Sequence, residues 1–331
     1  MSGKNQHPPM HSVMQEYVYL PSRAGRAAVE EFQRRAHTKL KVEWGVPTLD
    51  NYLVPMMPGD LISLVGRPGH AKTSLMIHLA RQTNHMLMQL HALGRPEHDH
   101  HVVYATWETL IEEAVALSIA PHSGYSLETI GRGLAAIPPL QRAIGATVDQ
   151  RIAIFGRSMV TSNGLVPTIE GLDIALTEMR QGGINPCLVL VDYLQRIPGD
   201  YRVERGQQVS ENLERLKDLA LRHRVPVVVG IQARRDVDEY RGLKFPRLND
   251  GQWSSNIEQT SDKVISLTRP SVYMQLGDDI EIGGKSYKVS HRTMGLQVVK
   301  ARWGPAGESF ILDLDPGKAV LSEAAPIASP Y

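Results

Sequence analysis

The sequence contains a single cysteine, Cys187, and no long hydrophobic run. One cysteine excludes an intramolecular disulfide and a zinc site built from several cysteines. Its apolar neighbours indicate a buried thiol rather than a nucleophile. No stretch approaches the roughly 18 consecutive apolar residues of a membrane span, and the polar, proline-bearing N-terminus has no apolar signal core. We therefore expect a cytoplasmic protein without a membrane partner.

The sequence also lacks an excess of charge of either sign. Lysine and arginine number 36 against 35 aspartate and glutamate residues, a formal net charge of +1, so bulk charge would not hold nucleic acid. Hydrophobic residues at 42% and charged residues at 21% are typical of a globular protein. A length of 331 residues fits one large domain or two small ones.

Candidate strands alternate with candidate helices from Val46 onward. Short apolar runs predict strands, and apolar residues at helical spacing predict helices between them. The predicted strands are 61–65, 101–106, 152–155, 188–191, 225–231 and 264–268, and the clearest helices are 74–91 and 209–223. This alternation predicts an α/β fold with a mainly parallel sheet covered by helices on both faces. The segments 280–290, 296–302 and 310–314 predict a C-terminal extension of antiparallel hairpins.

A glycine-rich segment lies between the first predicted strand and the first long helix. It departs by one residue from the P-loop pattern of glycine, four residues, then glycine, lysine and serine or threonine. In that pattern backbone N–H groups wrap a phosphate at a helix N-terminus, the lysine reaches the outer phosphates and the hydroxyl binds Mg²⁺. We therefore predict ATP and Mg²⁺ as cofactors. The predicted nucleotide-binding residues are Gly66, Arg67, Pro68, Gly69, His70, Ala71, Lys72, Thr73 and Ser74.

Ala71 occupies the position of the second glycine of this pattern. Its methyl group is tolerated if φ at this residue is negative, and it crowds the phosphate if φ is positive. A loop that only turns the chain is the plainer alternative. Because Lys72 and Thr73 stand in register with the pattern, between a strand and a helix, the P-loop is favoured.

Two carboxylates follow other predicted strands. Asp192 comes directly after the strand 188–191, where a P-loop protein carries the aspartate that holds its metal, so Thr73 and Asp192 are the predicted metal ligands. Glu108 lies just past the strand 101–106, at the carboxyl edge where an open parallel sheet binds its ligands. An acid that starts a helix is the alternative for Glu108, but its place in the sheet favours a base for water.

Five motifs in order resemble the RecA-like motor domain of DnaB-type replicative helicases. They are the entry to the P-loop (Gly45–Asp50, Pro58–Ile62 and Gly66–Pro68), Val191–Gln195, Val225–Gln232, Asn256–Asp262 and Lys300–Pro305. The resemblance covers residues 46–322. It implies that Glu108 is the catalytic base and that Gln232 senses nucleotide and couples it to DNA. It also implies that Lys300 and Arg302 reach the nucleotide of the neighbouring subunit; without it, they would be interpreted as a solvated hairpin edge.

The sequence departs from this family's pattern in three ways. Ala71 replaces the usual glycine, which bears on the rate of hydrolysis more than on nucleotide binding, and Gln252 replaces an arginine of the fourth motif. We also expect the chain to lack the family's helical N-terminal domain, which forms a collar and recruits primase. The predicted helix 24–39 matches in position the linker helix that docks on the next subunit. A minimal phage or plasmid helicase and a helicase-derived ATPase of defence or transposition both stay open.

In ring motors of this type, loops that face the central channel hold the DNA strand. The loop 196–208 carries three basic and two acidic side chains, and the loop 234–247 carries five basic and three acidic side chains. Repetition around a ring would make the channel basic, as a single-strand backbone requires; solvated loops of mixed charge are the alternative. The predicted DNA-binding residues are Arg196, Arg202, Arg205, Arg234, Arg235, Arg241, Lys244 and Arg247.

These features predict a flexible arm with a linker helix (1–45), a RecA-like ATPase domain (46–322) and a flexible tail (323–331). We expect an ATP hydrolase that forms a homo-oligomeric, hexameric ring, translocates on single-stranded DNA and unwinds duplex. The alternative is an ATPase of the same fold that does not unwind DNA. Such a protein would serve as a scaffold in phage defence or mobile-element function. The expected partner proteins are those of replication, defence or mobile elements.

Overall fold

The computed structural model describes residues 25, 26, 28–33, 40–95, 99–147, 150–160, 166–234, 242–247, 254–315 and 319–327. The chain divides into two units, residues 1–41 and 42–331. In the first unit, residues 25, 26 and 28–33 are helical, as predicted for 24–39, and the rest of that predicted helix lies outside the described residues. The second unit begins ahead of the boundary drawn at residue 46, because Val42 and Trp44 are buried in it.

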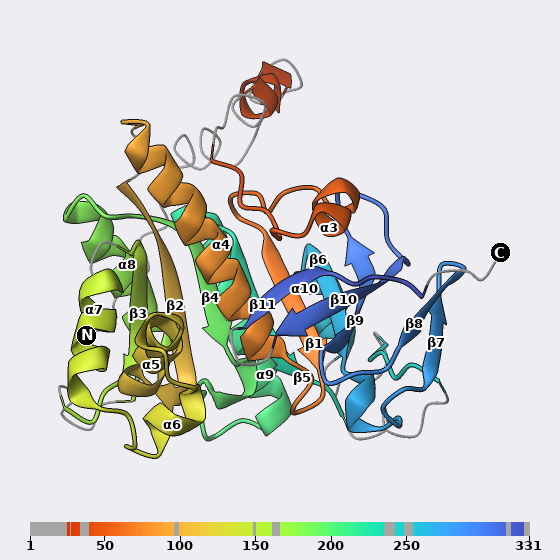
Figure 1. Cartoon of the computed structure of the whole chain (residues 1–331). Coiled ribbons are helices and arrows are strands. Elements are labelled where there is room, and N and C mark those ends of the chain that lie inside the picture. Colours follow the sequence, from red (N-terminus) through yellow and green to blue (C-terminus); the bar gives the residue numbers. More distant parts are fainter. Residues whose placement is uncertain are drawn as a thin grey trace. The chain divides into compact units, whose positions relative to one another are not determined.

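Nine strands of the described chain form one sheet, in the order β11-β10-β9-β6-β1-β5-β4-β2-β3 (Figure 1). The strands are β1 (Leu61–Gly66), β2 (His100–Leu110), β3 (Ile152–Arg157), β4 (Asn185–Asp192), β5 (Val227–Gln232), β6 (Lys263–Thr268), β9 (Thr293–Ala301), β10 (Ser309–Asp315) and β11 (Val320–Glu323). The strands from β6 to β3 pair in parallel, whereas β9, β10 and β11 add antiparallel strands at the other side of β6. The predicted α/β fold with an antiparallel extension is confirmed.

The remaining elements connect or cover these strands. The helices are α3 (Pro47–Tyr52), α4 (Lys72–Ala92), α5 (Ile111–Ser123), α6 (Leu127–Gly131), α7 (Ile137–Thr147), α8 (Ile169–Gln181), α9 (Arg205–His223) and α10 (Ser254–Thr260), with the 3-10 turns η2 (Leu194–Arg196) and η5 (Pro270–Val272). β7 (Asp279–Ile282) and β8 (Lys285–Lys288) form a separate antiparallel pair. In the part of the chain that the structure describes, no helix combines the length and apolarity needed to cross a membrane.

Some element boundaries differ from the prediction. The helix predicted for 209–223 begins at Arg205 and shortens the loop ahead of it. The strand predicted for 225–231 begins at Val227, because the backbone N–H of Val225 donates to the carbonyl of Ala220 and still belongs to the end of α9.

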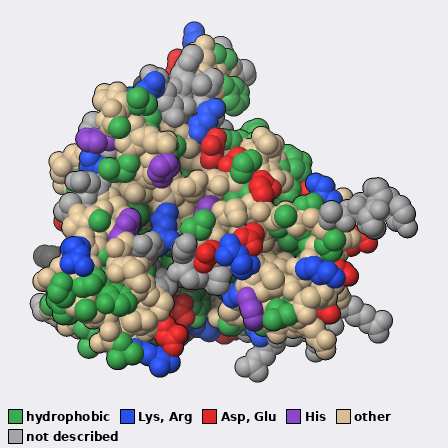
Figure 2. Space-filling view, viewed as in Figure 1, with side chains coloured by type: hydrophobic (Ala, Val, Ile, Leu, Met, Phe, Trp, Pro, Cys, Tyr) green, Lys and Arg blue, Asp and Glu red, His purple; other side chains and the backbone are tan. Residues whose placement is uncertain are grey.

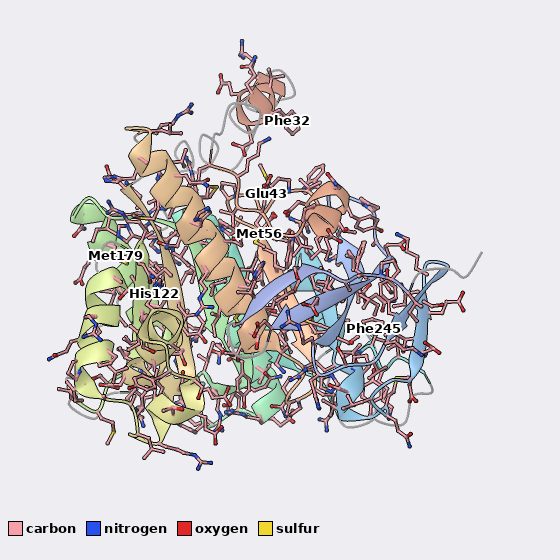
Figure 3. All side chains as sticks on the ribbon, in the orientation of Figure 1. Phe32, Glu43, Met56, His122, Met179 and Phe245 are labelled. Carbon is pink, nitrogen blue, oxygen red and sulfur yellow. The ribbon has the colours of Figure 1, made fainter. Side chains whose placement is uncertain are left out.

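Alternate residues of the central strands face opposite sides of the sheet. Leu61, Val189 and Val229 belong to a buried core shared with α8 and α9. Gly230, the residue after Val229 in β5, faces α4 on the opposite side of the sheet. A Cβ atom added to Gly230 would lie 2.9 Å from the side chain of Met76. Side chains fill the space between the sheet and its covering helices (Figure 3). Two packed faces leave the carboxyl edge of the parallel strands free to carry a site.

Candidate nucleotide-binding site

The predicted phosphate loop joins β1 to α4 at the carboxyl edge of the parallel strands. β1 ends at Gly66, and α4 begins at Lys72. A pocket of about 310 Å³ lies at this edge. It is lined by Pro68, Gly69, Ala71, Lys72, Thr73, Ser74, Glu108, Asp192, Tyr193, Gln232 and Arg269. The fold therefore gathers residues that follow or end β1, β2, β4, β5 and β6.

Three further residues of the predicted loop, Gly66, Arg67 and His70, do not line the pocket, and their contacts fix the shape of the loop. The carbonyls of Gly66 and Arg67 accept hydrogen bonds from the Lys72 ammonium at 2.8 and 3.0 Å. His70 is buried, and its ring stacks on that of Tyr273 with 6.2 Å between the ring centres. A side chain at Gly66 would bring a Cβ atom to 3.3 Å from the carbonyl of Leu267. The loop is thus fixed by contacts on both flanks.

Ala71 adopts a left-handed backbone conformation, with φ +66° and ψ +23°, directly before the first residue of α4. A residue with a Cβ atom pays about 1–2 kcal/mol for this conformation, which glycine adopts freely. The positive φ is the case in which the methyl group is expected to crowd a phosphate. This position therefore stores backbone strain inside the nucleotide-binding loop.

The Lys72 ammonium is largely buried. Burial lowers the pKa of Lys72 to about 8, against the opposing effect of the negative charges of Asp192 and Glu108. Arg67 adds a smaller repulsion in the same direction as burial. Because a bound polyphosphate would favour the charged ammonium, the site is set to gain a proton when an anion binds.

Asp192 ends β4 with its carboxylate buried at 2% residue exposure. The hydroxyls of Thr73 and Tyr104 both donate to its Oδ2 atom, at 2.7 and 2.8 Å. Burial raises the pKa of Asp192, and these two hydrogen bonds and Lys72 lower it. A hydroxyl and a carboxylate oxygen are the donor types that Mg²⁺ prefers, so Thr73 and Asp192 fit a divalent cation shared with phosphate. Tyr104 is a further residue of this candidate site, and the sequence motifs miss it.

Glu108 lies near the end of β2, which β4 and β5 separate from β1 and its phosphate loop. Burial and the charge of Asp192 raise the pKa of Glu108, while Arg196 and Lys72 lower it. A carboxylate of raised basicity beside a phosphate site suits the acceptance of a proton from water. Glu108 lines the pocket, and its role as catalytic base stays a prediction.

Gln232 ends β5 and is joined to η2 by the side chain of Gln195. The Gln195 amide donates to the Gln232 carbonyl, and its Oε1 atom accepts from the Gln232 N–H, both at 3.1 Å. η2 is the start of the predicted DNA-binding loop 196–208. The Gln195 side chain therefore connects the start of this loop with the backbone of a residue that lines the nucleotide pocket.

Arg269 follows β6 and lines the pocket, and the sequence motifs miss it as well. One guanidinium nitrogen, Nη2, donates to the carbonyl of His291 at 2.9 Å. Its Nε atom is buried, and no hydrogen-bond partner for it lies among the described residues. The only available signal is its place after a parallel strand, because such strand ends carry ligands.

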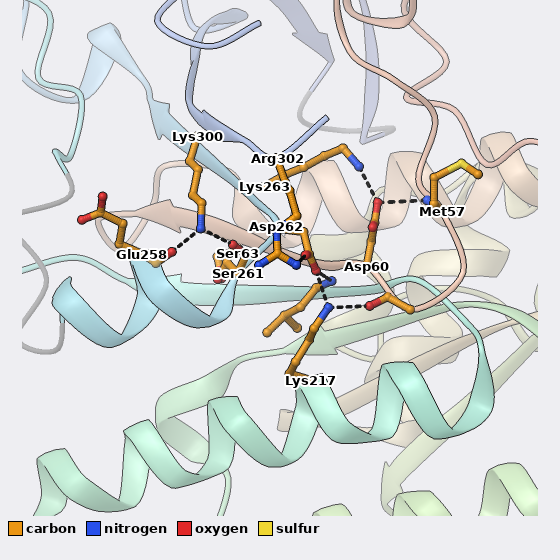
Figure 4. A network of polar contacts seen from close by, with 12 residues as sticks. Met57, Asp60, Ser63, Lys217, Glu258, Ser261, Asp262, Lys263, Lys300 and Arg302 are labelled. Atoms are coloured by element: carbon orange, nitrogen blue, oxygen red, sulfur yellow. Dashed lines mark hydrogen bonds and ion pairs between the residues drawn. The ribbon is translucent and has the colours of Figure 1, made fainter. Parts of the chain in front are cut away.

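Lys300 and Arg302 lie at the amino edge of the parallel strands, beside Ser261 and Asp262 (Figure 4). β9 runs antiparallel to β6, so its last residues stand opposite Lys263, where β6 begins, while the pocket residue Arg269 follows the end of β6. A strand of six residues is about 17 Å long. The structure therefore does not bring Lys300 and Arg302 to the pocket of their own subunit.

The predicted DNA-binding arginines and lysine lie on three segments. Arg196 is in η2, Arg202 pairs with Asp200 at 2.7 Å, and Arg205 begins α9 and donates to the Gln195 carbonyl. Arg234 follows β5, and Lys244 and Arg247 lie on the described segment 242–247. Lys244 is placed by Tyr273, whose hydroxyl accepts its N–H at 3.0 Å and whose ring lies 5.1 Å from its ammonium. Arg235, Arg241 and Gln252 lie outside the described residues.

Comparison with solved structures supports the fold. One solved structure, described as an ATPase domain, superimposes with a TM-score of 0.70 at 20% identity, covering 91% of this chain and 98% of that chain. A DnaB-like replicative helicase, determined in a study of its interactions with primase, gives a TM-score of 0.69 at 20% identity, covering 96% and 72%.

Comparison of sequences identifies the family. The replicative DNA helicase DnaB of Leifsonia xyli subsp. xyli (strain CTCB07) is 28% identical over 276 residues, which cover 78% of this chain and 54% of that protein. The chain spans about half the length of the curated relatives it matches. The family described as DnaB-like helicase C terminal domain matches residues 42–312, most of the chain. The chain therefore belongs to the family of DnaB-like helicase C-terminal domains.

Proposed function

We propose that this protein is an ATP-driven motor of the DnaB helicase type, a homo-hexameric ring that translocates on single-stranded DNA and unwinds duplex. One observation carries this proposal: the pocket residues and Arg302, which the family resemblance assigns to the nucleotide of a neighbouring subunit, lie at opposite edges of the sheet. The phosphate loop, Asp192 and Glu108 lie at one edge, and Arg302 lies at the other. A subunit would complete its pocket only with the arginine of a neighbour, which supports a closed ring of identical copies.

In this proposal each pocket residue has a separate role in ATP hydrolysis. The loop N–H groups and Lys72 would bind the phosphates of ATP, and a divalent cation such as Mg²⁺, held by Thr73 and Asp192, would neutralise part of their charge. Glu108 would accept a proton from water as the water oxygen bonds to the γ-phosphorus and the bond to the β-phosphate oxygen breaks. Arg302 of the neighbour would stabilise the charge on the transferred phosphoryl group.

Two surfaces support the assembly and the DNA contact. Apolar side chains gather over α6 and α7 (Figure 2), among them the exposed Leu134, Ile137 and Ile144. An exposed apolar surface of this kind favours association with another copy. Arg196 ends η2, which the Gln195 side chain joins to Gln232. Lys244 contacts Tyr273, whose ring stacks on that of His70 in the phosphate loop. Movement at the phosphate site would therefore reach residues that could hold a DNA backbone.

Strand displacement tests the proposal. With ATP and Mg²⁺, the protein is expected to release a labelled strand from a forked duplex, and Glu108→Gln is expected to bind nucleotide without release, because an amide cannot accept the proton of water. Glu112→Gln is the matched control, since Glu112 is exposed and bonds to Ser158 outside the pocket. ATP-dependent assembly without any strand release would contradict the motor and favour a scaffold ATPase.

A further inference from the structure

Two buried carboxylates lie at the amino edge of the sheet, one ahead of β1 and one ahead of β6 (Figure 4). Asp60 accepts a backbone N–H at 3.0 Å and pairs with Lys263. Asp262 accepts a backbone N–H at 2.8 Å and pairs with Lys217 at 2.6 Å. Each carboxylate therefore has its own lysine and its own backbone donor, which is what burial of one negative charge requires.

Asp262 differs from Asp60 because it also contacts an arginine. Nη1 of Arg302 lies 2.9 Å from Oδ1 of Asp262, the carboxylate oxygen that Lys217 does not use. The Arg302 side chain is 52% exposed, whereas that of Asp262 is 4% exposed. Since Lys217 already balances the charge of Asp262, the pairing with Arg302 is not needed to bury the carboxylate. Its effect is to fix one side of a guanidinium group that stays accessible on the other.

The main chain fixes Arg302 at the same point. Its backbone N–H donates to the Asp262 carbonyl at 2.8 Å, immediately after the last residue pair of β6 and β9. Lys300 is used differently: its ammonium donates to the carbonyls of Ser261, at 2.7 Å, and of Glu258. The lysine thus holds the end of α10 in its own subunit, and the arginine is the group left to act outside it.

Resting on the role of Arg302 proposed above, we infer that Asp262 is a positioning residue, which holds Arg302 in place for the nucleotide phosphates of the neighbouring subunit. A free arginine side chain loses rotamer entropy when it contacts a phosphate, and a guanidinium fixed in advance loses less of it. Position matters because a displacement of about 1 Å at a reacting centre costs about 100-fold in rate.

Mixed rings test this inference. Rings formed from Arg302→Ala and Lys72→Ala subunits contain one kind of complete site, a pocket of the first variant with the arginine of the second. Adding Asp262→Asn to the Lys72→Ala subunit, the arginine donor, is expected to reduce hydrolysis by about 10- to 100-fold. Adding it instead to the Arg302→Ala subunit is expected to cause no comparable loss, because that subunit has no Arg302 to position.

The comparison of Asp262→Asn in the two kinds of subunit distinguishes an effect on the position of Arg302 from an effect on folding. Equal losses in both arrangements, or no loss with the donor, would overturn the inference, whereas mixed rings that never hydrolyse ATP even without Asp262→Asn would overturn the shared site itself. Asp60→Asn in the donor is the matched control and is expected to leave the rate of the mixed ring unchanged. If Asp262→Asn subunits do not enter rings, Asp262→Glu is used instead, because it keeps the negative charge beside Lys217 but moves the carboxylate. A mixed ring that hydrolyses ATP at the full rate with Asp262→Glu in the arginine donor would contradict the inference.

Discussion

The Thr73 hydroxyl donates a 2.7 Å hydrogen bond to the Asp192 carboxylate, which joins the start of α4 to the end of β4. Tyr104, from the neighbouring strand β2, donates to the same oxygen at 2.8 Å. Asp192 is buried, and burial raises its pKa. Two hydroxyl donors therefore keep this carboxylate available in its charged form.

Tyr104→Phe is expected to move the acid limb of Mg²⁺-dependent nucleotide binding to higher pH. Loss of the Tyr104 hydroxyl removes one of the groups that lower the pKa of Asp192, so the carboxylate takes up its proton at a higher pH and stops holding a cation there. A hydrogen bond to a charged group is worth about 1.5 kcal/mol or more, which corresponds to about one pH unit. Titration of a fluorescent nucleotide at several pH values measures the shift. Tyr52→Phe is the control, since Tyr52 packs on Phe310, and equal shifts in both variants would contradict the role of Tyr104.

Lys72 gives a second pH effect, in which nucleotide binding weakens because the ammonium loses its proton as the pH rises. With a pKa of about 8, about half of the Lys72 side chains are neutral at pH 8, and triphosphate binding is expected to draw in about half a proton there. Affinity is therefore expected to fall as the pH rises through 8. Calorimetry in two buffers with different heats of ionisation measures the uptake. Lys72→Ala should lose nucleotide binding and Lys72→Arg should lose the uptake; a parent protein that binds without proton uptake at pH 8 would remove the basis of this prediction.

The parallel strands could be predicted because their signal is local. β1 and β6 are buried along their whole length, and such strands give continuous apolar runs. β11 has four residues, of which Leu321 is the buried one, so no run marks it. The start of α9 at Arg205 has no apolar signal either, because its first turn carries no apolar stripe and is held by contacts with η2, such as that of the Arg205 guanidinium with the Gln195 carbonyl.

The candidate site could be predicted where the signal lies within one segment, either in a motif or at the end of a strand. Lys72 and Thr73 follow from the phosphate loop, whereas the contact between Tyr104 and Asp192 depends on β2 lying beside β4. Arg269 enters the pocket because β6 lies beside β1. Strand order is a property of the whole sheet, and neighbours in the sheet leave no local pattern in the sequence.

The proposed channel residues predict a salt effect. Replacing Arg234 and Lys244 together by alanine should weaken binding to single-stranded DNA and reduce the slope of log affinity against log salt by about 0.7 for each phosphate that is no longer neutralised. Fluorescence anisotropy over a salt series gives the slope. Arg215→Ala is the control, because Arg215 pairs with Glu170 between α9 and α8. A slope that does not change would move the DNA-binding surface away from these two residues.

The left-handed conformation of Ala71 gives a prediction in which the rate of hydrolysis changes more than the stability of the fold. Ala71→Gly is expected to relieve about 1–2 kcal/mol of left-handed strain, offset by about 0.4–1 kcal/mol because glycine frees the unfolded chain. The melting temperature should therefore stay level or rise slightly, and steady-state hydrolysis should increase as the methyl group leaves the phosphate loop. Ala319→Gly is a matched control, since Ala319 also has a positive φ, +50°, directly before β11. Ala319→Gly should share the effect on stability and leave hydrolysis unchanged. If Ala71→Gly folds, assembles and hydrolyses ATP at the parent rate, the loop accommodates the methyl group without cost to turnover.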